Sequence, residues 1–373
     1  MGHMSFGLLK HFKEAKNVGA EAMASKHYRH IILGQDLGAI LRLMEIRRNA
    51  PEESVRLIST RPINRQALIE NYDFGVSQLR SAAAVENIYK KYHNARILPQ
   101  TGEATFYKDG KFHDFSGRAK SMELLPGEEF FTQKGYKLDP SSLFTEAEWE
   151  NLDAVLRDHS EIRIFESIDK TTPSDLVDKK EWNLTFKDFS SATCETLYVS
   201  MSPKKFLNHL QNKDKITAEL IDVCSSVKIQ GAISVTWKLD KEIFPEDKTL
   251  FIPQSMTHDW GHFIVEFETF NFQKKEQLCH VLFLIHEEEP QTEDLGSKIR
   301  LMKRVLDRVF SDIEKHIKQE YIRFDEEMFI SDVKDSAIEQ LSFDYPTLQF
   351  LGQASPMTGE LFQEKFLART LLN

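Results

Sequence analysis

The sequence predicts an α/β protein in which a parallel sheet is interrupted by an inserted antiparallel sheet. Three observations predict this fold class. A strand–glycine–helix–strand pattern occupies residues 30–61, β-prone runs dominate residues 227–286, and a last strand, glycine-containing turn and helix occupy residues 348–372. With 373 residues the chain is long enough for two domains.

The first pattern reads as one βαβ unit. An apolar run at residues 31–33 ends at Gly34, and apolar positions then recur at helical spacing over residues 37–44. Residues 49–51 break the helix, and residues 55–59 give the second strand. In such a unit the turn after the first strand points a helix N-terminus outward, where free N–H groups and the helix dipole favour a phosphate.

The glycine fingerprint of dinucleotide-binding units, G-x-G-x-x-G, aligns with Gly34, Asp36 and Ala39. Gly34 can make the tight turn, and Ala39 allows the helix and strand to pack closely. Asp36 replaces the central glycine and brings a negative charge to the place where a pyrophosphate would approach. The second strand ends at residues 59–61 without the acidic residue that would bind a ribose. A bound dinucleotide and a phosphate-free Rossmann-like unit therefore both stay open.

The composition excludes some classes of function. A formal net charge of −10 argues against general nucleic-acid binding, which needs a basic face. No run of eighteen apolar residues is present, and no export leader is recognisable, so we expect a cytoplasmic protein without a transmembrane segment. Cys194, Cys224 and Cys279 are widely spaced and form no CxxC motif, which favours buried, reduced thiols over a metal site.

Residues 5–25 form an amphipathic pattern with lysines at positions 10, 13 and 16. One interpretation is a helix for peripheral membrane contact or for a partner protein. A leading helix packed on the body, or a frayed tail, is the interpretation that general helix statistics favour.

The elements that follow are expected in order along the chain. A helix is expected over residues 63–93, and Asp109-Gly110 between two β-prone runs signals a hairpin. Thr145 and Glu148 have the spacing of a capping box, which predicts a helix over residues 146–159. Strands are then expected over residues 161–168, 182–186 and 196–201, followed by a short helix over residues 204–211.

From residue 227 the pattern becomes β-rich. Strands expected over residues 232–239, 250–252, 263–270 and 281–286 read as an antiparallel sheet with one packed face. A long amphipathic helix is expected over residues 296–320. The chain then ends with a strand over 348–351, a turn over 352–359 and a helix over 360–372.

Three separated segments together carry a family resemblance. They are the βαβ unit, the segment CETLYVSMSPKKFLNHL at residues 194–210, and the segment LQFLGQASPMTGELFQEKFLARTLL at residues 348–372. The chain resembles the FAD-dependent oxidoreductases of the amine oxidase, phytoene desaturase and UDP-galactopyranose mutase group, whose architecture the Rab GDP-dissociation inhibitors share. The resemblance implies a Rossmann-like FAD/NAD(P)-binding domain and an inserted substrate domain of α+β type. The first would comprise residues 26–100, 160–225 and 331–373, and the second residues 101–159 and 226–330, after an N-terminal helix or tail at 1–25.

The resemblance also implies a set of residues that hold FAD, drawn from the βαβ turn, the end of its second strand and the C-terminal turn. They are Gly34, Gln35, Asp36, Leu37, Gly38, Ala39, Ser59, Thr60, Arg61, Gly352, Gln353, Ala354, Pro356, Met357 and Thr358. The sequence departs from the family pattern at Asp36, at residues 59–61, at residues 62–65 and at Gln353. No catalytic residue and no metal ligand can be assigned from the sequence.

Three hypotheses of function follow, and the first ranks highest. In this hypothesis the chain is an FAD-dependent oxidoreductase that moves a hydride from an unknown small-molecule substrate to flavin. Five side chains of the β-rich region could line a substrate pocket, although ordinary core is the favoured interpretation for most of them: Trp237, Trp260, His262, Phe263 and Phe267. Alternatively it is a flavin-free pseudoenzyme that binds a protein or ligand, which Asp36 supports because a buried carboxylate opposes a pyrophosphate. The weakest hypothesis is an NAD(P)-linked protein that uses Arg61 for a 2′-phosphate.

Overall fold

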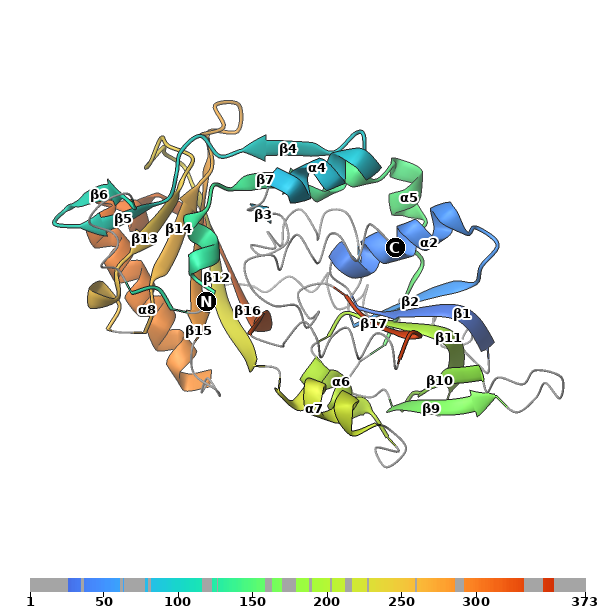
Figure 1. The fold of residues 1–373 in the computed structure, drawn as a ribbon. Coiled ribbons are helices and arrows are strands. Elements are labelled where there is room, and N and C mark those ends of the chain that lie inside the picture. The colour runs from blue at the N-terminus through green and yellow to red at the C-terminus, as the bar shows by residue number, and fades with distance from the viewer. Residues whose placement is uncertain are drawn as a thin grey trace, which may run out of the picture.

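The computed structural model of the protein describes residues 26–34, 37–60, 63, 78–79, 82–115, 123–125, 127–157, 163–169, 179–187, 190–201, 203–211, 217–226, 228–258, 260–285, 292–331 and 345–351. These residues form three β sheets, and Figure 1 shows the two large ones side by side. One of them is built around parallel strands and the other is mostly antiparallel, so the predicted fold class is confirmed. The predicted domain boundaries stay a prediction.

The first sheet has the strand order β8-β2-β1-β11-β10-β9, and β17 also pairs with β11. Its strands are β1 (Lys26–Leu33), β2 (Val55–Ser59), β8 (Ala154–Leu156), β9 (Arg163–Asp169), β10 (Lys179–Thr185), β11 (Ser191–Val199) and β17 (Leu348–Phe350). β1, β2, β8, β11 and β17 run parallel, β10 is antiparallel to β11, and β9 is antiparallel to β10. β11 pairs with β10 through its first residues and with β17 through its last.

Helices cover both faces of the first sheet. Ile32 of β1 packs with α2 (Leu37–Asn49), whereas Ile31 and Leu33 point to the other face, towards α6 (Pro203–His209) and α7 (Ala218–Ser226). This alternation is the two-residue period of a strand that is buried on both faces. α2 is buried from Gly38 to Ile46 because further elements lie over its outer side. They are α4 (Ala82–Lys91), β4 (Arg96–Pro99), β7 (Tyr136–Asp139), η3 (Pro140–Leu143) and α5 (Glu146–Glu150).

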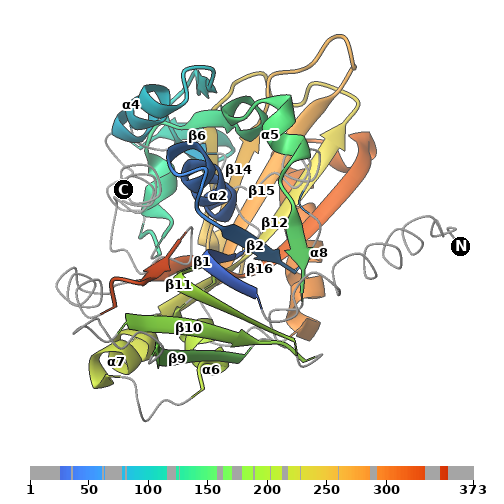
Figure 2. The ribbon, with the colours of Figure 1, turned by 90° about the vertical axis from the view of Figure 1, so that its right-hand side faces the viewer.

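The second sheet has the strand order β16-β12-β15-β14-β13-β5-β6. Its strands are β5 (Thr105–Lys108), β6 (Lys111–Asp114), β12 (Lys228–Leu239), β13 (Thr249–Ile252), β14 (Phe263–Phe267), β15 (Gln277–Ile285) and β16 (Ile317–Ser331). All neighbours pair antiparallel except β13 and β5. The amphipathic helix α8 (Thr292–Val309) covers one face through Leu301, Met302, Val305 and Leu306. The opposite face is turned towards the first sheet (Figures 1 and 2).

A small third sheet, β3-β7-β4, lies across one end of the molecule, where Figure 1 draws β4 and β7 at the top. It adds β3 (Gln78–Leu79) to β7 and β4. After β4 the chain enters the second sheet, where Thr101 and Gly102 donate backbone hydrogen bonds to the carbonyl oxygen of Asp247, both at 3.1 Å. The third sheet therefore joins the two large sheets.

Two turn signals read from the sequence are confirmed. Asp109 and Gly110 connect β5 to β6 with positive φ angles of 52° and 78°, the conformation that Asp-Gly favours in a two-residue hairpin. The Thr145 side chain accepts a hydrogen bond from the Glu148 N–H, and the Glu148 carboxylate accepts one from the Thr145 N–H. This capping box fixes the start of α5.

Three predicted helices are wrong in extent. The helix expected over 146–159 ends at Glu150, because Asn151 caps it and Asp153 turns the chain with φ 41°, which lets residues 154–156 pair with β2. The helix expected over 296–320 ends at Val309, because Asp312 adopts a left-handed conformation (φ 66°) and the chain continues through η7 (Ile313–His316) into β16. In the helix expected over 63–93, residues 78–79 are a strand paired with β7, and α4 accounts for 82–91.

The other predicted strands and helices that fall on described residues are found near their expected positions, whereas β4, β7, η3 and α7 were not predicted. Two single turns of 3₁₀ helix, η2 (Glu129–Thr132) and η6 (Gln254–Met256), had no definite prediction. The N-terminal amphipathic pattern, the C-terminal turn and the last predicted helix lie outside the described residues. Within the described part of the chain, no helix has the length and apolar character needed to cross a membrane.

Candidate functional site

The candidate site lies at the carboxyl edge of the first sheet, where five parallel strands end together. One residue beyond the strands, backbone hydrogen bonds continue the ladder: Gly34 donates to Ile58 (3.0 Å), Ser200 donates to Leu33 (2.7 Å), and Leu351 donates to Val199 (2.7 Å). These bonds hold Gly34 and Ser200 beside each other. The edge points towards the second sheet (Figure 1).

This edge contains a topological switch point. From β1 the chain passes through α2 to β2 on one side, while β11 on the other side of β1 is reached only later in the sequence. In open sheets with parallel strands, ligands bind in the crevice outside the carboxyl ends at such a point. The residues at the ends of β1 and β11 are therefore candidate ligand contacts.

Gly34 makes a close approach that excludes a side chain. A Cβ atom at this position would lie 2.5 Å from the Cβ of Ser200 and 3.0 Å from the Cβ of Ala39. The contact with Ala39 shows that the first turn of α2 packs tightly against the end of β1, as the fingerprint predicts. The role of these residues in holding a cofactor stays a prediction.

Ser200 is a site residue that sequence reasoning missed. Its Oγ atom is buried, lies near the Gly34 backbone, and makes no hydrogen bond to any residue that the structure describes. A buried hydroxyl without a partner is costly, so it marks a place where a polar ligand atom can be bound. The only sequence signal was its position near the end of the strand predicted over residues 196–201.

Most of the other predicted contacts cannot be placed. Ser59 is buried at the end of β2, where its carbonyl oxygen accepts a hydrogen bond from the Arg157 N–H at 2.8 Å, and Thr60 is exposed beside it. Leu37 begins α2, and Gly38 and Ala39 are buried in its first turn. The remaining predicted residues lie outside the described part of the chain: Gln35, Asp36, Arg61, Gly352, Gln353, Ala354, Pro356, Met357 and Thr358.

A buried charged cluster fixes α2 to the sheet. The Arg42 guanidinium lies 5.1 Å from the centre of the Tyr198 ring and 3.3 Å from the Glu45 carboxylate, and both charged side chains are almost fully buried. Burial raises the pKa of the Tyr198 phenol, which keeps this ring neutral. On the neighbouring strand, His30 Nε2 lies 2.6 Å from the Glu53 carboxylate. Neither acid lies in the first turn of α2, which contains no acidic residue. Asp36, the acid directly before that turn, lies outside the described residues.

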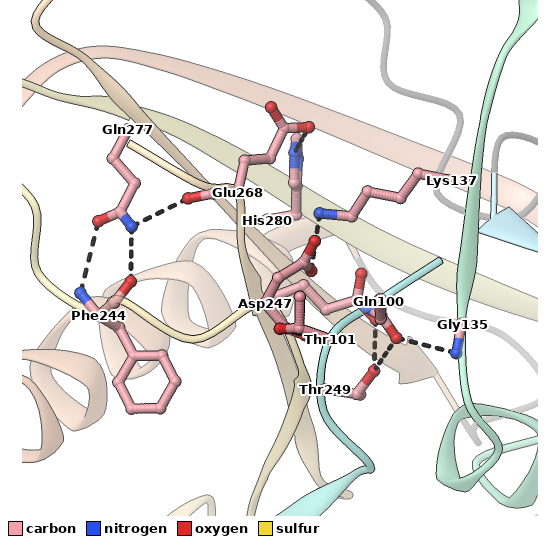
Figure 3. A network of polar contacts seen from close by, with 11 residues as sticks. Gln100, Thr101, Gly135, Lys137, Phe244, Asp247, Thr249, Glu268, Gln277 and His280 are labelled. Atoms are coloured by element: carbon pink, nitrogen blue, oxygen red, sulfur yellow. Dashed lines mark hydrogen bonds and ion pairs between the residues drawn. The ribbon is translucent and has the colours of Figure 1, made fainter. Parts of the chain in front are cut away.

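The second sheet contributes a row of buried polar side chains on the face opposite α8. Thr236, His280, Glu266 and Thr249 occupy directly opposite positions on β12, β15, β14 and β13. A 3.0 Å hydrogen bond joins the Thr236 hydroxyl to His280 Nδ1, and the Thr249 hydroxyl donates to Glu266 at 2.6 Å. Figure 3 shows Gln100 continuing this row, with its side-chain oxygen accepting a hydrogen bond from the Gly135 N–H at 3.0 Å.

Charged groups from separate parts of the chain meet beside this row (Figure 3). Lys137 Nζ on β7 lies 3.2 Å from the Asp247 carboxylate, and burial raises the pKa of Asp247 despite this neighbour. Glu268 lies 3.4 Å from His280 Nε2. Burial acts to raise the pKa of Glu268, but hydrogen bonding and attraction from His280 outweigh it, so the pKa is lowered.

The aromatic side chains proposed from the sequence are mostly core. Trp237, Phe263 and Phe267 are fully buried beneath α8, on the face turned away from the first sheet, as the core interpretation expects. Trp260 is partly buried and lies 5.3 Å from the Lys298 ammonium group. His262 is buried on the opposite face, where its Nδ1 lies 2.6 Å from the Glu128 carboxylate.

Glu128 is a second buried polar side chain that the sequence analysis did not single out. Its carboxylate accepts hydrogen bonds from the backbone N–H groups of Leu125 (2.8 Å) and His262 (2.9 Å), besides its contact with the His262 ring. The carboxylate therefore ties the segment around η2 to the start of β14. This arrangement reads as structural, because three protein groups already satisfy the carboxylate.

Metal and thiol chemistry find no support in the described residues. Among them, no group of three or more His, Cys, Asp or Glu side chains could hold a metal ion. Cys194, Cys224 and Cys279 are free thiols and buried. Burial raises the pKa of all three, to about 12 for Cys224, so they stay protonated.

Comparisons with known proteins support the fold. No family model matches the sequence, and no curated protein matches it. Several solved structures are similar to this protein over most of the chain. A fatty acid isomerase from P. acnes that produces CLA is 10% identical, with a TM-score of 0.58 over 92% of this chain and 97% of its own. Cyclohexylamine oxidase from Brevibacterium oxydans IH-35A is 8% identical, with a TM-score of 0.57 over 92% and 99%. An oxidoreductase from Methanosarcina mazei is 9% identical, with a TM-score of 0.55 over 87% and 94%. The chain therefore shares its overall fold with these enzymes, a Rossmann-like part beside a second, mostly antiparallel sheet.

Proposed function

We propose that this protein is an FAD-dependent oxidoreductase that transfers a hydride from a small-molecule substrate to the flavin. The observation that supports this proposal is the carboxyl edge of the first sheet, where a glycine that admits no side chain lies beside a buried hydroxyl with no hydrogen-bond partner among the described residues. The likeness to an amine oxidase and to other enzymes over nearly the whole chain supports the same proposal.

The described residues fit the nucleotide half of FAD. Gly34 and Ala39 bring the start of α2 close to the end of β1, so the first N–H groups of α2 face the edge where a pyrophosphate would bind. Ser200 offers a hydroxyl for a polar atom of the cofactor. Ser59 and Thr60 end the second strand, where a ribose lies in Rossmann-type units.

The flavin itself, when bound, supplies the capacity to accept a hydride, and the protein supplies position and electrostatics. We place the substrate between the two large sheets, against the face of the second sheet opposite α8. The polar side chains there are buried and are held by hydrogen bonds to one another or, for Gln100, to the Gly135 N–H, so they would keep fixed positions beside a bound substrate.

The visible absorption spectrum of the purified protein tests the proposal, before and after addition of FAD. An oxidised flavin that remains with the protein after desalting supports it and justifies a screen of amines and other substrates. A colourless protein that also ignores added FAD refutes it, and the flavin-free binding protein would then be the better hypothesis.

Two matched variants locate the site. Ser200→Ala removes the unpartnered hydroxyl and should weaken FAD binding by about tenfold, the value of one hydrogen bond to a polar group, without lowering the free energy of unfolding. Ser191→Ala changes the same residue type at the opposite end of β11 and should leave FAD binding unchanged. Equal affinities in the two variants would exclude Ser200 from the site.

A further inference from the structure

We propose that Thr236, His280 and Glu268 form a proton relay on the face of the second sheet opposite α8, and that the substrate of the site is an alcohol. The inference rests on the proposed function, because it names the groups that take the substrate's proton while the hydride leaves. The Thr236 hydroxyl lies 3.0 Å from His280 Nδ1, and His280 Nε2 lies 3.4 Å from the Glu268 carboxylate. A hydroxyl, an imidazole and a carboxylate in hydrogen-bonded order can move a proton from the first group to the second.

The Glu268 carboxylate determines which nitrogen of His280 carries the proton. Burial acts to raise the pKa of Glu268, but hydrogen bonding and attraction from His280 outweigh it, so the pKa is lowered and the side chain is ionised. An ionised carboxylate only accepts hydrogen bonds, so Nε2 of the neutral ring carries the proton and donates it to Glu268. Nδ1 then has a lone pair, and the Thr236 hydroxyl donates to it.

The Thr236 oxygen can in turn accept a proton. Among the described residues, its hydroxyl is hydrogen-bonded only to His280. Tyr321 lies opposite Thr236 on β16, but its hydroxyl donates to the Gln319 side-chain oxygen at 3.2 Å. No described residue therefore competes with a substrate for the lone pairs of the Thr236 oxygen.

The relay leads from the interior towards solvent. Thr236 and His280 are buried, at 6% and 3% exposed, whereas the Glu268 side chain is 36% exposed. A proton that reaches His280 can therefore leave through the end of the relay at Glu268.

The charged groups around His280 favour the imidazolium that the relay forms. Glu266 occupies the position directly opposite His280 on β14, and Glu268 lies on the Nε2 side of the ring. The Lys137 ammonium group also faces this cluster, but it lies 3.2 Å from the Asp247 carboxylate, which offsets its charge (Figure 3). Nearby carboxylates stabilise the charged form of a histidine.

An alcohol is the class of substrate that needs such a relay. Loss of hydride from the carbon of an alcohol gives a carbonyl only if the O–H bond also breaks, and an alcohol is a very weak acid. An amine can lose hydride with the help of its nitrogen lone pair and needs no base. In the alcohol, the electron pair of the C–H bond leaves as hydride to the flavin, the O–H proton moves to the Thr236 oxygen, and the Thr236 proton moves to His280 Nδ1. The carbonyl compound and a His280 imidazolium result.

Long-range ¹H–¹⁵N NMR spectra of the full chain test the direction of the relay without any substrate. The signals of His280 are those that His280→Gln removes from the spectrum of the 13 histidines. We expect the neutral ring to carry its proton on Nε2. A proton on Nδ1 overturns the inference, because His280 would then donate to Thr236 and could not take its proton.

Rapid anaerobic mixing of the FAD-loaded protein with alcohols, and with amines of the same carbon skeletons, tests the substrate class. The probes are benzyl alcohol and cyclohexanol, against benzylamine and cyclohexylamine, and the loss of visible flavin absorbance gives the rate. We expect Thr236→Val to slow reduction by an alcohol by about 100-fold or more without changing FAD binding, and Thr236→Ser to restore most of the rate. Thr105→Val is the matched control. Thr105 is a buried threonine of the same sheet, paired with Leu250 beneath α8, and its loss should not change the rate.

His280→Gln separates proton transfer from packing. A glutamine can accept the hydrogen bond from Thr236 but cannot take up its proton. The rate with an alcohol should therefore fall as far as in Thr236→Val and should no longer rise with pH. The double variant should be no slower than either single variant, because the two residues act as one unit.

The outcomes distinguish this inference from the proposed function. A protein that retains no flavin overturns both. A flavoprotein that no alcohol of the panel reduces overturns the inference alone. So does one in which Thr236→Val and Thr105→Val are reduced at the same rate, or one in which His280→Gln keeps the pH dependence of the wild type.

Discussion

Replacing Gly34 with alanine tests whether the close approach of β1 and β11 is rigid. The added Cβ would lie 2.5 Å from the Cβ of Ser200 and 3.0 Å from the Cβ of Ala39. Carbon atoms in contact are normally about 3.5–4.0 Å apart, so the first contact overlaps by about 1 Å. Neither neighbour is the end of a flexible side chain, and both belong to regular or hydrogen-bonded backbone. The strand ends must therefore move apart.

The expected loss follows from this geometry. Overpacking in a closely packed interior costs about 1–3 kcal/mol, and the backbone bond from Ser200 to Leu33 (2.7 Å) would lengthen at the same time. We expect Gly34→Ala to lower the free energy of unfolding by this amount, measured by urea denaturation. Gly296→Ala is a matched control, because among the described residues its Cβ would meet only the Arg300 side chain, at 3.6 Å within α8. There the change should stabilise the helix by up to about 1 kcal/mol.

A double variant separates the contact from other effects of the substitution. Ser200→Gly removes the opposing Cβ and alone should cost about 0.5–1 kcal/mol through added freedom of the unfolded chain. If the clash is the cause, Gly34→Ala with Ser200→Gly should lose less than the sum of the two single changes by about 1 kcal/mol or more. Strict additivity, or a Gly34→Ala variant as stable as the wild type, would refute the reasoning.

Three further predictions concern buried groups. Glu128→Gln should lower the free energy of unfolding by about 1–3 kcal/mol, because an amide cannot accept all the donors of Leu125 and His262, whereas exposed Glu129→Gln should change it little. The three cysteines should react with a thiol reagent slowly in the native protein and completely after unfolding, since burial holds them protonated; fast native labelling would contradict this. Burial raises the pKa of Asp247 above its ordinary 3.8, so the folded state binds its proton more tightly than the unfolded state does. We therefore compare the free energy of unfolding of the wild type with that of Asp247→Asn. The difference, wild type minus variant, should fall as the pH rises from 3.8 through the raised pKa, by at most about 1.4 kcal/mol per pH unit. A difference that rises with pH would contradict a raised pKa for Asp247.

Features decided by neighbouring residues could be predicted from the sequence. The βαβ unit was recognisable because an apolar run, a glycine and a helical period follow one another within thirty residues or so. The hairpin at Asp109-Gly110 and the capping box at Thr145 were recognisable for the same reason, since each depends on side chains within three positions. In these places local chemistry and the final fold agree.

Features decided by distant contacts could not be predicted in the same way. Residues 313 and 317 continue the apolar spacing of α8, yet the left-handed turn at Asp312 ends the helix and directs the chain into β16. Likewise, residues 154–156 become a strand because β2 offers an unpaired edge. A helical period and a strand period are hard to distinguish over a few residues, and tertiary pairing decides between them.

The candidate site shows the same division. Gly34 and Ala39 were found because the fingerprint is a local motif, and the structure places both at the close approach between α2 and the sheet. Ser200 was missed because its significance depends on the parallel pairing of β11 with β1, more than 160 positions apart in the sequence. The polar row of Thr236, His280 and Glu266 was missed for the same reason, since no periodicity in the sequence aligns separate strands.

The polar row also bears on how the two large sheets keep their relative position. Apolar contacts tolerate sliding, whereas a buried hydrogen bond or ion pair that loses its partner costs its full desolvation. The end of β4 and strand β7 reach the second sheet through such contacts: Gln100 beside Thr249, and Lys137 beside Asp247. Moving the third sheet by one residue would leave the Lys137 ammonium group and the Asp247 carboxylate unpaired in the interior. The network therefore favours one arrangement of the sheets over its neighbours, which is what a site built between them requires.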